Sequence, residues 1–218
     1  MELDHIFLRT SAGAPEAALL LELGLTEGSA NQHPGQGTAN RRFFFHNAFL
    51  ELLWIASPAE VSNAATSPTQ LAQRLAPEQT ASPFGLCFRP SEADSTPPFP
   101  SWPYRPAYLP AGMQVDIASN TPLYEPMWFY LAQAVPPTQA EAARRQPLQH
   151  TLGVNAISAI SVTVPGTEDW SAAALAARAC TGLRLQRGSA HLLELTFDQG
   201  RQGRTCDLRP ALPLMLHL

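Results

Sequence analysis

The order of local patterns at the two ends of the chain restricts the fold more than any other feature. The first pattern reads strand, helix, strand, strand, strand over residues 2–10, 15–25, 26–38, 39–47 and 48–56. The same order returns near the C-terminus over residues 156–166, 168–180, 181–188, 190–198 and 204–218. Repetition at this scale predicts an α+β fold built from duplicated β-α-β-β-β modules.

The middle of the chain is a weaker version of this pattern. Strands are predicted at 84–94, 111–119 and 125–133, but the proline-rich stretch 95–106 replaces the helix. The predicted organisation is a domain at 1–135 with module 1 at 1–56 and a degenerate module 2 at 84–133, a linker at 136–150, and a third β-α-β-β-β-like module at 151–218 packed on the first two.

The charged residues and cysteines exclude several classes of protein. All 14 basic residues are arginines, so a P-loop and Schiff-base chemistry, which both need lysine, are excluded. The net charge of -4 and the scattered arginines argue against nucleic-acid binding. No apolar run reaches the roughly 18 residues that span a bilayer, so we expect no membrane partner and a cytoplasmic protein. Three scattered cysteines form no disulfide framework.

The motifs of the first module resemble those of one family. "LDHIFL" opens the first strand, and "HPGQGTANRRFFFHNAFLELLWI" spans residues 33–55. These segments resemble the glyoxalase-like domain proteins of the vicinal oxygen chelate superfamily. The resemblance implies curved mixed sheets around an open cup, a small-molecule ligand and a homodimer. It also implies one divalent metal ion (Zn, Ni, Fe or Mn), with His5 and Glu51 in the positions of the two first-module ligands.

The second pair of ligands is where the sequence departs from the family. When "FGLCFRP" is aligned on the first strand, Gly85 takes the histidine position, and Tyr130 lies near the glutamate position. When the C-terminal copy is used instead, Ala159 matches His5 and Glu194 matches Glu51. Neither alignment restores four ligands. The predicted metal ligands are therefore His5, Glu51 and Glu194, and the partner module stays open, within one chain or across a dimer.

The remaining candidates concern the substrate. Glu51 and Tyr130 are the predicted catalytic residues, since a carboxylate can move a proton and a phenol can donate a hydrogen bond to a bound oxygen. The predicted pocket residues are His33, Arg42, Trp128 and Tyr130. Only one of Arg41 and Arg42 can face the cup, because neighbouring strand residues point to opposite sides. For His5 the alternative is an ordinary hydrogen-bonded core residue.

Three functions fit these patterns. The first is binding of a small oxygen-bearing molecule, with metal-assisted lyase, isomerase or dioxygenase-type chemistry. The second is a non-catalytic sequestering protein, in which a degenerate metal site is expected and an apolar cavity holds the ligand. The third is a scaffold whose sheets serve dimerisation. A bound metal would indicate the first function, an apolar cavity without a metal the second, and a filled cup the third.

Overall fold

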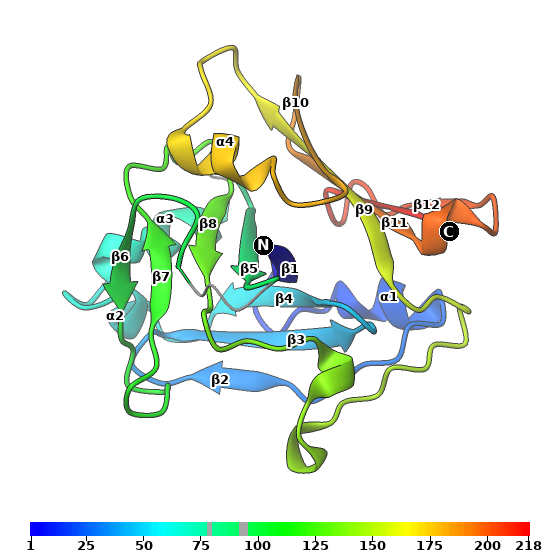
Figure 1. The fold of residues 1–218 in the computed structure, drawn as a ribbon, viewed down its shortest axis with the longest axis horizontal. Helices are drawn as coiled ribbons and strands as arrows, with labels where there is room; N and C mark the ends of the chain where they lie inside the picture. The colour runs from blue at the N-terminus through cyan, green and yellow to red at the C-terminus, as the bar shows by residue number, and fades with distance from the viewer. Residues whose placement is uncertain (78–79, 92–95) are drawn as a thin grey trace.

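The first 130 residues build a curled eight-stranded sheet in the order β2-β3-β4-β1-β5-β8-β7-β6 (Figure 1). The computed structural model describes residues 1–77, 80–91 and 96–218. The strands are β1 (Glu2–Arg9), β2 (Asn31–His33), β3 (Thr38–Phe44), β4 (Phe49–Ile55), β5 (Phe84–Arg89), β6 (Ser101–Tyr104), β7 (Val115–Ala118) and β8 (Met127–Tyr130). Helix α1 (Ala17–Glu22) connects β1 to β2. The α+β class with a curled mixed sheet is confirmed.

The sheet consists of two similar halves that meet at its centre. β1 runs parallel to β4, and β5 runs parallel to β8. β1 and β5 pair antiparallel, with His5 opposite Cys87 and Phe7 opposite Gly85. Modules 1 and 2 therefore pair within one chain, which settles the question that the sequence left open.

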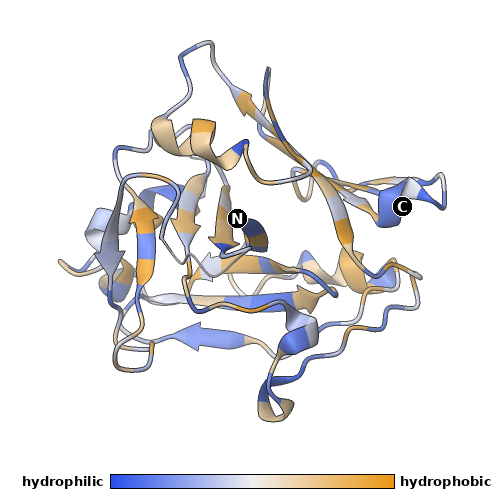
Figure 2. Ribbon diagram, in the orientation of Figure 1, coloured by the Kyte–Doolittle hydropathy of each residue, from blue (hydrophilic) through white to orange (hydrophobic). Residues whose placement is uncertain are grey.

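The central strands are apolar on both sides because both faces of the sheet are covered. Every residue of β5 and β8 is buried, and β1 is buried from Leu3 to Leu8. Strands of this kind read as continuous hydrophobic runs. Figure 2 shows the contrast with β2, which lies at the sheet edge and is hydrophilic. A polar residue in the middle of β1 is therefore exceptional.

The C-terminal residues form a second sheet of five strands in the order β10-β9-β11-β13-β12. Its strands are β9 (Ile157–Pro165), β10 (Leu183–Gly188), β11 (Leu192–Phe197), β12 (Thr205–Asp207) and β13 (Leu214–His217), with helix α4 (Ala172–Ala177) after β9. The element order is the predicted one up to β11, but the single strand predicted at 204–218 is two strands, β12 and β13, which pair antiparallel. The pairing is different from that of module 1, because α4 returns the chain to a strand that lies directly beside β9 and parallel to it. The domain boundaries stay a prediction.

Two hydrophobic clusters cover the two faces of the large sheet. The larger joins one face to α1, α4 and the five-stranded sheet, and includes Ile6, Leu20 and Val162. The smaller lies on the other face and includes Phe7, Leu53 and Phe129. Side chains alternate between faces along a strand, so β1, β4, β5, β7 and β8 each contribute to both clusters.

Some elements were not predicted from the sequence. Helices α2 (Pro58–Val61) and α3 (Leu71–Leu75) follow β4, and β6 lies inside the proline-rich stretch. Short 3-10 turns occur at Ser67–Thr69, Pro137–Gln139, Ala142–Arg144 and Asp198–Gly200. The strand predicted at 84–94 ends at Arg89, and residues 92–94 lie outside the described residues. Within the described ranges, no helix has the length and apolar character needed to span a membrane.

Candidate functional site

His5 lies on β1 at a cavity on the face of the smaller hydrophobic cluster. A register shift between Leu3 and His5 allows two consecutive residues, Asp4 and His5, to line this cavity. Nδ1 of His5 lies 2.7 Å from Oδ2 of Asp4, and its ring stacks on Phe49 with centroids 4.4 Å apart. An ionised carboxylate only accepts hydrogen bonds, so Nδ1 is the donor in this pair, and in a neutral imidazole Nε2 is then the acceptor.

Glu51 lies on β4 and completes the cluster. Its side chain is buried, with the residue 5% exposed. Asn40 donates a hydrogen bond to Oε1, and Oε2 lies 3.7 Å from Nε2 of His5. Burial of a carboxylate is costly unless polar groups surround it. We refer to Asp4, His5 and Glu51 as the acid–histidine cluster.

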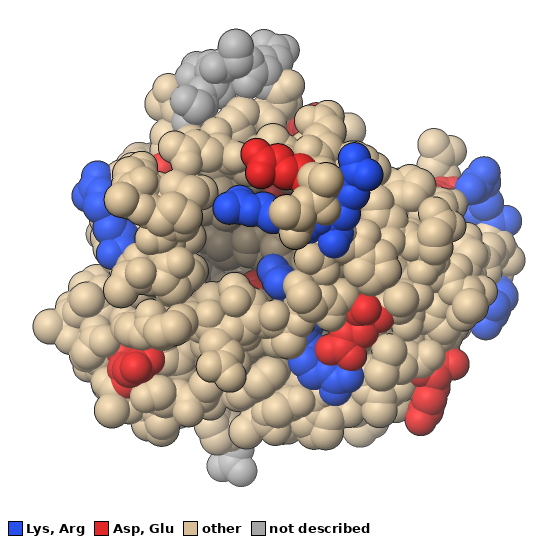
Figure 3. Space-filling view, turned by 90° about the horizontal axis from the view of Figure 1, so that it is seen from below, with Lys and Arg blue, Asp and Glu red and all other residues tan. Residues whose placement is uncertain are grey.

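The cavity above this cluster has a volume of about 440 Å³. Figure 3 shows an opening in the molecular surface with basic side chains along its border. The walls are mostly apolar and come from both modules, and Phe49, Leu53, Ile117 and Phe129 are among them. Drug-sized ligands bind in cavities of this size, lined by apolar groups with a few polar ones. The structure therefore has a cup with a charged floor and apolar walls.

His33 and Tyr108 close one side of the cup. Nδ1 of His33 lies 2.8 Å from Oγ1 of Thr38, and its ring lies 4.7 Å from that of Tyr108. Burial lowers the pKa of His33 despite the opposing charge of Glu51. Burial also raises the pKa of Tyr108, and the charge of Glu51 acts in the same direction. Near neutral pH the imidazole is therefore neutral and the phenol is protonated, and both are hydrogen-bonding groups.

The predicted residues divide into two groups. His5, Glu51, His33 and Arg42 all line the cup. Arg42 is thus the arginine that faces the cup, and Arg41 instead pairs with Glu27 through two hydrogen bonds.

Three predicted residues are not brought to the cup. Trp128 and Tyr130 belong to the larger hydrophobic cluster on the opposite face of β8, because it is Phe129, between them, that faces the cup. Glu194 lies on β11 in the other sheet, where Oε1 is 3.1 Å from Nε2 of His217. These placements correct the predicted positions of all three side chains.

Sequence reasoning missed several residues of the site. Asp4 directly precedes His5, but the regular alternation of a strand places it on the other face, and only the register shift reverses this. Asn40 and Tyr108 carry no motif. Asn40 is identified by its position two residues before Arg42 on the same strand, whereas Tyr108 comes from a loop after β6.

Comparison with known proteins agrees with the geometry. Residues 3–97 match the model of the glyoxalase-like domain family. This stretch of the chain is thus similar to a glyoxalase-like domain. The resemblance predicted from the first module is thereby confirmed. No match was found among curated proteins.

The whole chain also resembles solved structures. One is the crystal structure of a hypothetical protein from Staphylococcus aureus, with a TM-score of 0.53 and 9% sequence identity. The match covers 99% of this chain and 98% of that one. At this identity it shows the fold alone, and it includes the C-terminal sheet in that fold.

The second half of the glyoxalase-like sheet supplies no metal ligand at the positions related to His5 and Glu51. On β1, Phe7 lies two residues after His5 and is paired with Glu51. On β5, Cys87 lies two residues after Gly85 and is paired with Phe129. With Gly85 in the place of His5, the residue in the place of Glu51 is thus Phe129. The predicted match with Tyr130 was one residue out of register, which moves a side chain to the other face.

Another group of donors lies beside the histidine. Asp4, His5 and Cys87 each offer one ligand atom, and these atoms lie within 4.8 Å of one another. Burial, above all, and the nearby charges of Asp4 and Glu51 raise the pKa of the Cys87 thiol. Without a cation beside it, the thiol is therefore protonated. The donors fit a metal held mainly by the first module and do not fit a four-ligand site shared by two modules.

Gly85 cannot be replaced without moving its neighbour. A Cβ atom at this position would lie 2.0 Å from Cε1 of Phe7, which is buried. We expect Gly85→Ala to lower the free energy of unfolding by about 1–3 kcal/mol, as in other overpacked cores. Urea denaturation measures this change. Combining it with Phe7→Leu should cost less than the sum of the two single variants, and a stability equal to the wild type in Gly85→Ala would contradict the placement of Phe7.

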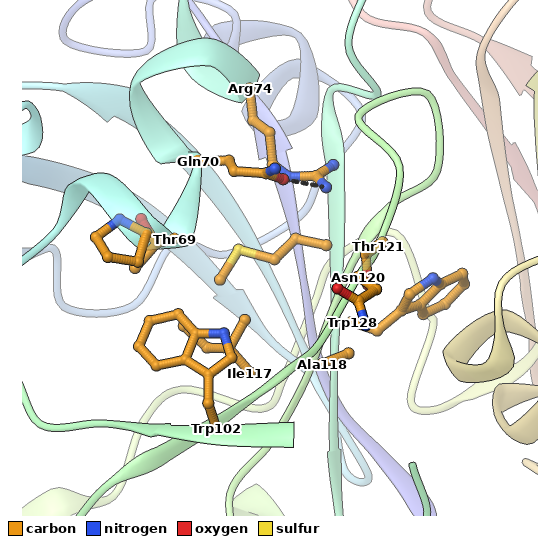
Figure 4. Close-up of a pocket in the computed structure, with 11 residues that line it drawn as sticks. Thr69, Gln70, Arg74, Trp102, Ile117, Ala118, Asn120, Thr121 and Trp128 are labelled. Atoms are coloured by element: carbon orange, nitrogen blue, oxygen red, sulfur yellow. Dashed lines mark hydrogen bonds between the residues drawn. The ribbon is translucent and has the colours of Figure 1, made fainter. Parts of the chain in front are cut away.

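One of the other cavities, of about 170 Å³, shares Ile117 and Met127 with the cup (Figure 4). Trp102 and Trp128 border it, and Arg74 reaches it from α3. None of the predicted metal or catalytic residues lines this cavity. The cup is therefore the better candidate for the functional site.

Proposed function

We propose that the cup binds one small oxygen-bearing molecule and that the acid–histidine cluster acts on it by proton transfer, as in lyases and isomerases. The observation that carries this proposal is the buried acid–histidine cluster at the floor of a mostly apolar 440 Å³ cavity. Two buried carboxylates beside one imidazole destabilise a protein unless they are well paired. Such clusters are concentrated at functional sites.

Each residue of the cluster has a defined part in this proposal. Nε2 of His5 accepts a proton from the ligand, and Asp4 stabilises the imidazolium that forms, because its Oδ2 lies 2.7 Å from Nδ1. Glu51, held by Asn40, is a second base on the other side of Nε2. Tyr108 and His33 are in position to donate or accept hydrogen bonds to a bound oxygen.

A divalent metal is a second candidate, favoured by one observation. Metal-ligating histidines usually donate their other ring N–H to a carboxylate, and Asp4 receives such a bond from His5. In this case Nε2 of His5 and Glu51 would hold the ion, and Cys87, which is grouped with Asp4 and His5, offers an additional donor. A bound metal would polarise neighbouring oxygens of the ligand. Glu194 would take no part, because it lies in the other sheet.

Proton transfer is tested by isotope exchange. A panel of small hydroxy and oxo compounds is incubated with the protein in D2O, and loss of C–H signals is followed by NMR. We expect exchange or conversion of at least one compound, slowed about 10²–10⁴-fold in His5→Ala and in Glu51→Gln. The matched control is Glu194→Gln, which alters the other glutamate–histidine pair outside the cup. Binding without exchange would favour the sequestering function instead.

The metal is tested separately by elemental mass spectrometry of protein purified without chelator or affinity-tag metals. Near-stoichiometric metal that is lost in the His5→Ala, Glu51→Ala double variant, and kept in Glu194→Ala, His217→Ala, would support the metal-assisted function. Protein that takes up none of zinc, nickel, manganese or ferrous iron would exclude it. The proton-transfer function would then stand on the side chains alone.

The predicted homodimer and cytoplasmic location are part of this proposal. Both modules of the cup belong to one chain, so the proposed site needs no residue from a second copy. We therefore expect the ligand affinity of the dimer to equal that of the monomer that forms on dilution. Sedimentation measures which of the two is present.

A further inference from the structure

The charges of the cup are separated along its depth. Asp4 and Glu51 lie buried at the floor, whereas Arg42 is half-buried and Arg144 is exposed. All four line the same cavity. Figure 3 shows basic side chains at the border of the opening. A molecule entering the cup therefore passes Arg144 and Arg42 before it reaches Asp4 and Glu51.

Arg42 is held in a fixed position with one edge unused. Its Nε donates to the backbone oxygen of Ser29 at 2.8 Å, and its Nη2 donates to Oγ of Ser29 at 2.9 Å. The guanidinium also lies over the ring of Phe44, 5.1 Å from its centroid. Among the described residues, the structure records no hydrogen bond from Nη1 and no ion pair with Glu51. A guanidinium oriented in this way is prepared to bind an oxyanion.

Arg144 comes from a different part of the chain. It ends the 3-10 turn Ala142–Arg144 in the segment that connects the two sheets, and this segment borders the cup together with Ala134 and Val135. The neighbouring Arg145 is also exposed but does not line the cavity. Arg144 and Arg145 are therefore both exposed, but only Arg144 lines the cup.

We propose that the ligand of the cup is an organic oxyanion, whose carboxylate or phosphate group binds Arg42 and Arg144 while its apolar body lies against Phe49 and Phe129. This inference rests on the proposed function and names its substrate class. The oxyanion is directed to the opening because Glu51 repels it from the floor, where Asp4 is already paired with Arg89 at 3.7 Å. The other end of the ligand, which carries a hydroxyl group or an acidic C–H, then reaches His5.

The experiment compares matched compounds that differ only in charge. Small aromatic and aliphatic carboxylic acids are paired with their amides, and phosphate monoesters with their parent alcohols. Binding is measured by NMR shifts of cup residues in the wild type and in Arg42→Gln, Arg144→Gln and Arg145→Gln. We expect the anions to bind about tenfold tighter than their neutral partners, which corresponds to one charge-assisted interaction. Comparison of the carboxylic acids with the phosphate monoesters shows which of the two oxyanions the cup prefers.

The variants locate the preference. Arg42→Gln should remove most of it, Arg144→Gln should reduce it about threefold because this side chain is exposed, and Arg145→Gln should leave it unchanged. Arg42→Lys, which retains the charge, should keep part of the preference and controls for a folding defect. Equal binding of neutral and anionic partners, or an unchanged preference in the Arg42→Gln, Arg144→Gln double variant, would overturn the oxyanion and leave the proposed function standing. A panel in which no compound of either kind shifts the cup signals would contradict both.

Discussion

Replacing Arg74 by methionine is expected to lower the free energy of unfolding by about 3–5 kcal/mol, the cost of breaking a buried polar network on one side. Arg74 lies on α3 and is 1% exposed. Its Nη1 donates to the backbone oxygen of Glu125 at 2.6 Å, and its Nη2 donates to Pro122 at 3.3 Å and to Gln70 at 3.2 Å. Methionine fills much of the space but removes all of these hydrogen bonds, and the Pro122 oxygen then keeps only the one from the Glu125 amide.

The charge of Arg74 is retained in the folded protein. Burial lowers the pKa of its guanidinium to about 10, opposed by the charge of Glu125, so the group is protonated at neutral pH. Denaturation in urea at pH 7 measures the loss of stability. Gln73→Met on the same helix is the control, because Gln73 is exposed and a surface change costs at most about 0.5 kcal/mol. A loss below about 1 kcal/mol for Arg74→Met would show that the loop before β8 is stable without this arginine.

The second large effect is expected for Trp128→Ala, which should destabilise the protein by about 3–5 kcal/mol as other buried aromatic truncations do. The indole is fully buried, and its Nε1–H donates to Oε2 of Glu125 at 3.2 Å. The same carboxylate accepts two hydrogen bonds from Ser171, which caps helix α4 through a bond from the Ala174 amide. Loss of the indole therefore opens a cavity where the two sheets are joined.

The neighbouring residue on β8 provides a matched comparison. Phe129 faces the cup, and its ring lies 5.3 Å from that of His5. We expect Phe129→Leu to cost less than about 1.5 kcal/mol of stability, as conservative hydrophobic changes do, and to weaken ligand binding. Calorimetry for stability and the NMR panel for binding separate the two effects. If the Trp128→Ala protein were stable but no longer bound ligands, Trp128 would line the ligand pocket, as predicted from the sequence.

The network around Glu125 connects the eight-stranded sheet to helix α4. Arg74 binds its backbone oxygen, and Trp128 and Ser171 bind its carboxylate. The same two residues, Arg74 and Trp128, also border the smaller cavity (Figure 4). Their role is thus to fix the second module, whose strands form a wall of the cup. Destabilising variants here should disturb the cup only through that wall.

The sequence by itself determined the first module and the residues it brings to the cup. The order of strand, helix and three strands was predicted correctly, and so was the family match over this region. His5, Glu51, His33 and Arg42 all line one cavity as expected. These features follow from local periodicity and from a motif in which the residues lie on adjacent strands. A regular strand then decides on which face each side chain lies.

Only the tertiary structure decided the rest of the site. The register shift that turns Asp4 into the cup depends on pairing with β5, about 80 residues away, and the face of Trp128 and Tyr130 depends on the register of β8. Tyr108 enters the cup from a loop with no pattern of its own. Helix α4 likewise sets the pairing of β9 with β10, which no local pattern distinguishes from that of the first module. Local preferences extend over a few residues, whereas a shift of one position in a long-range pairing moves a side chain from the cup to the core.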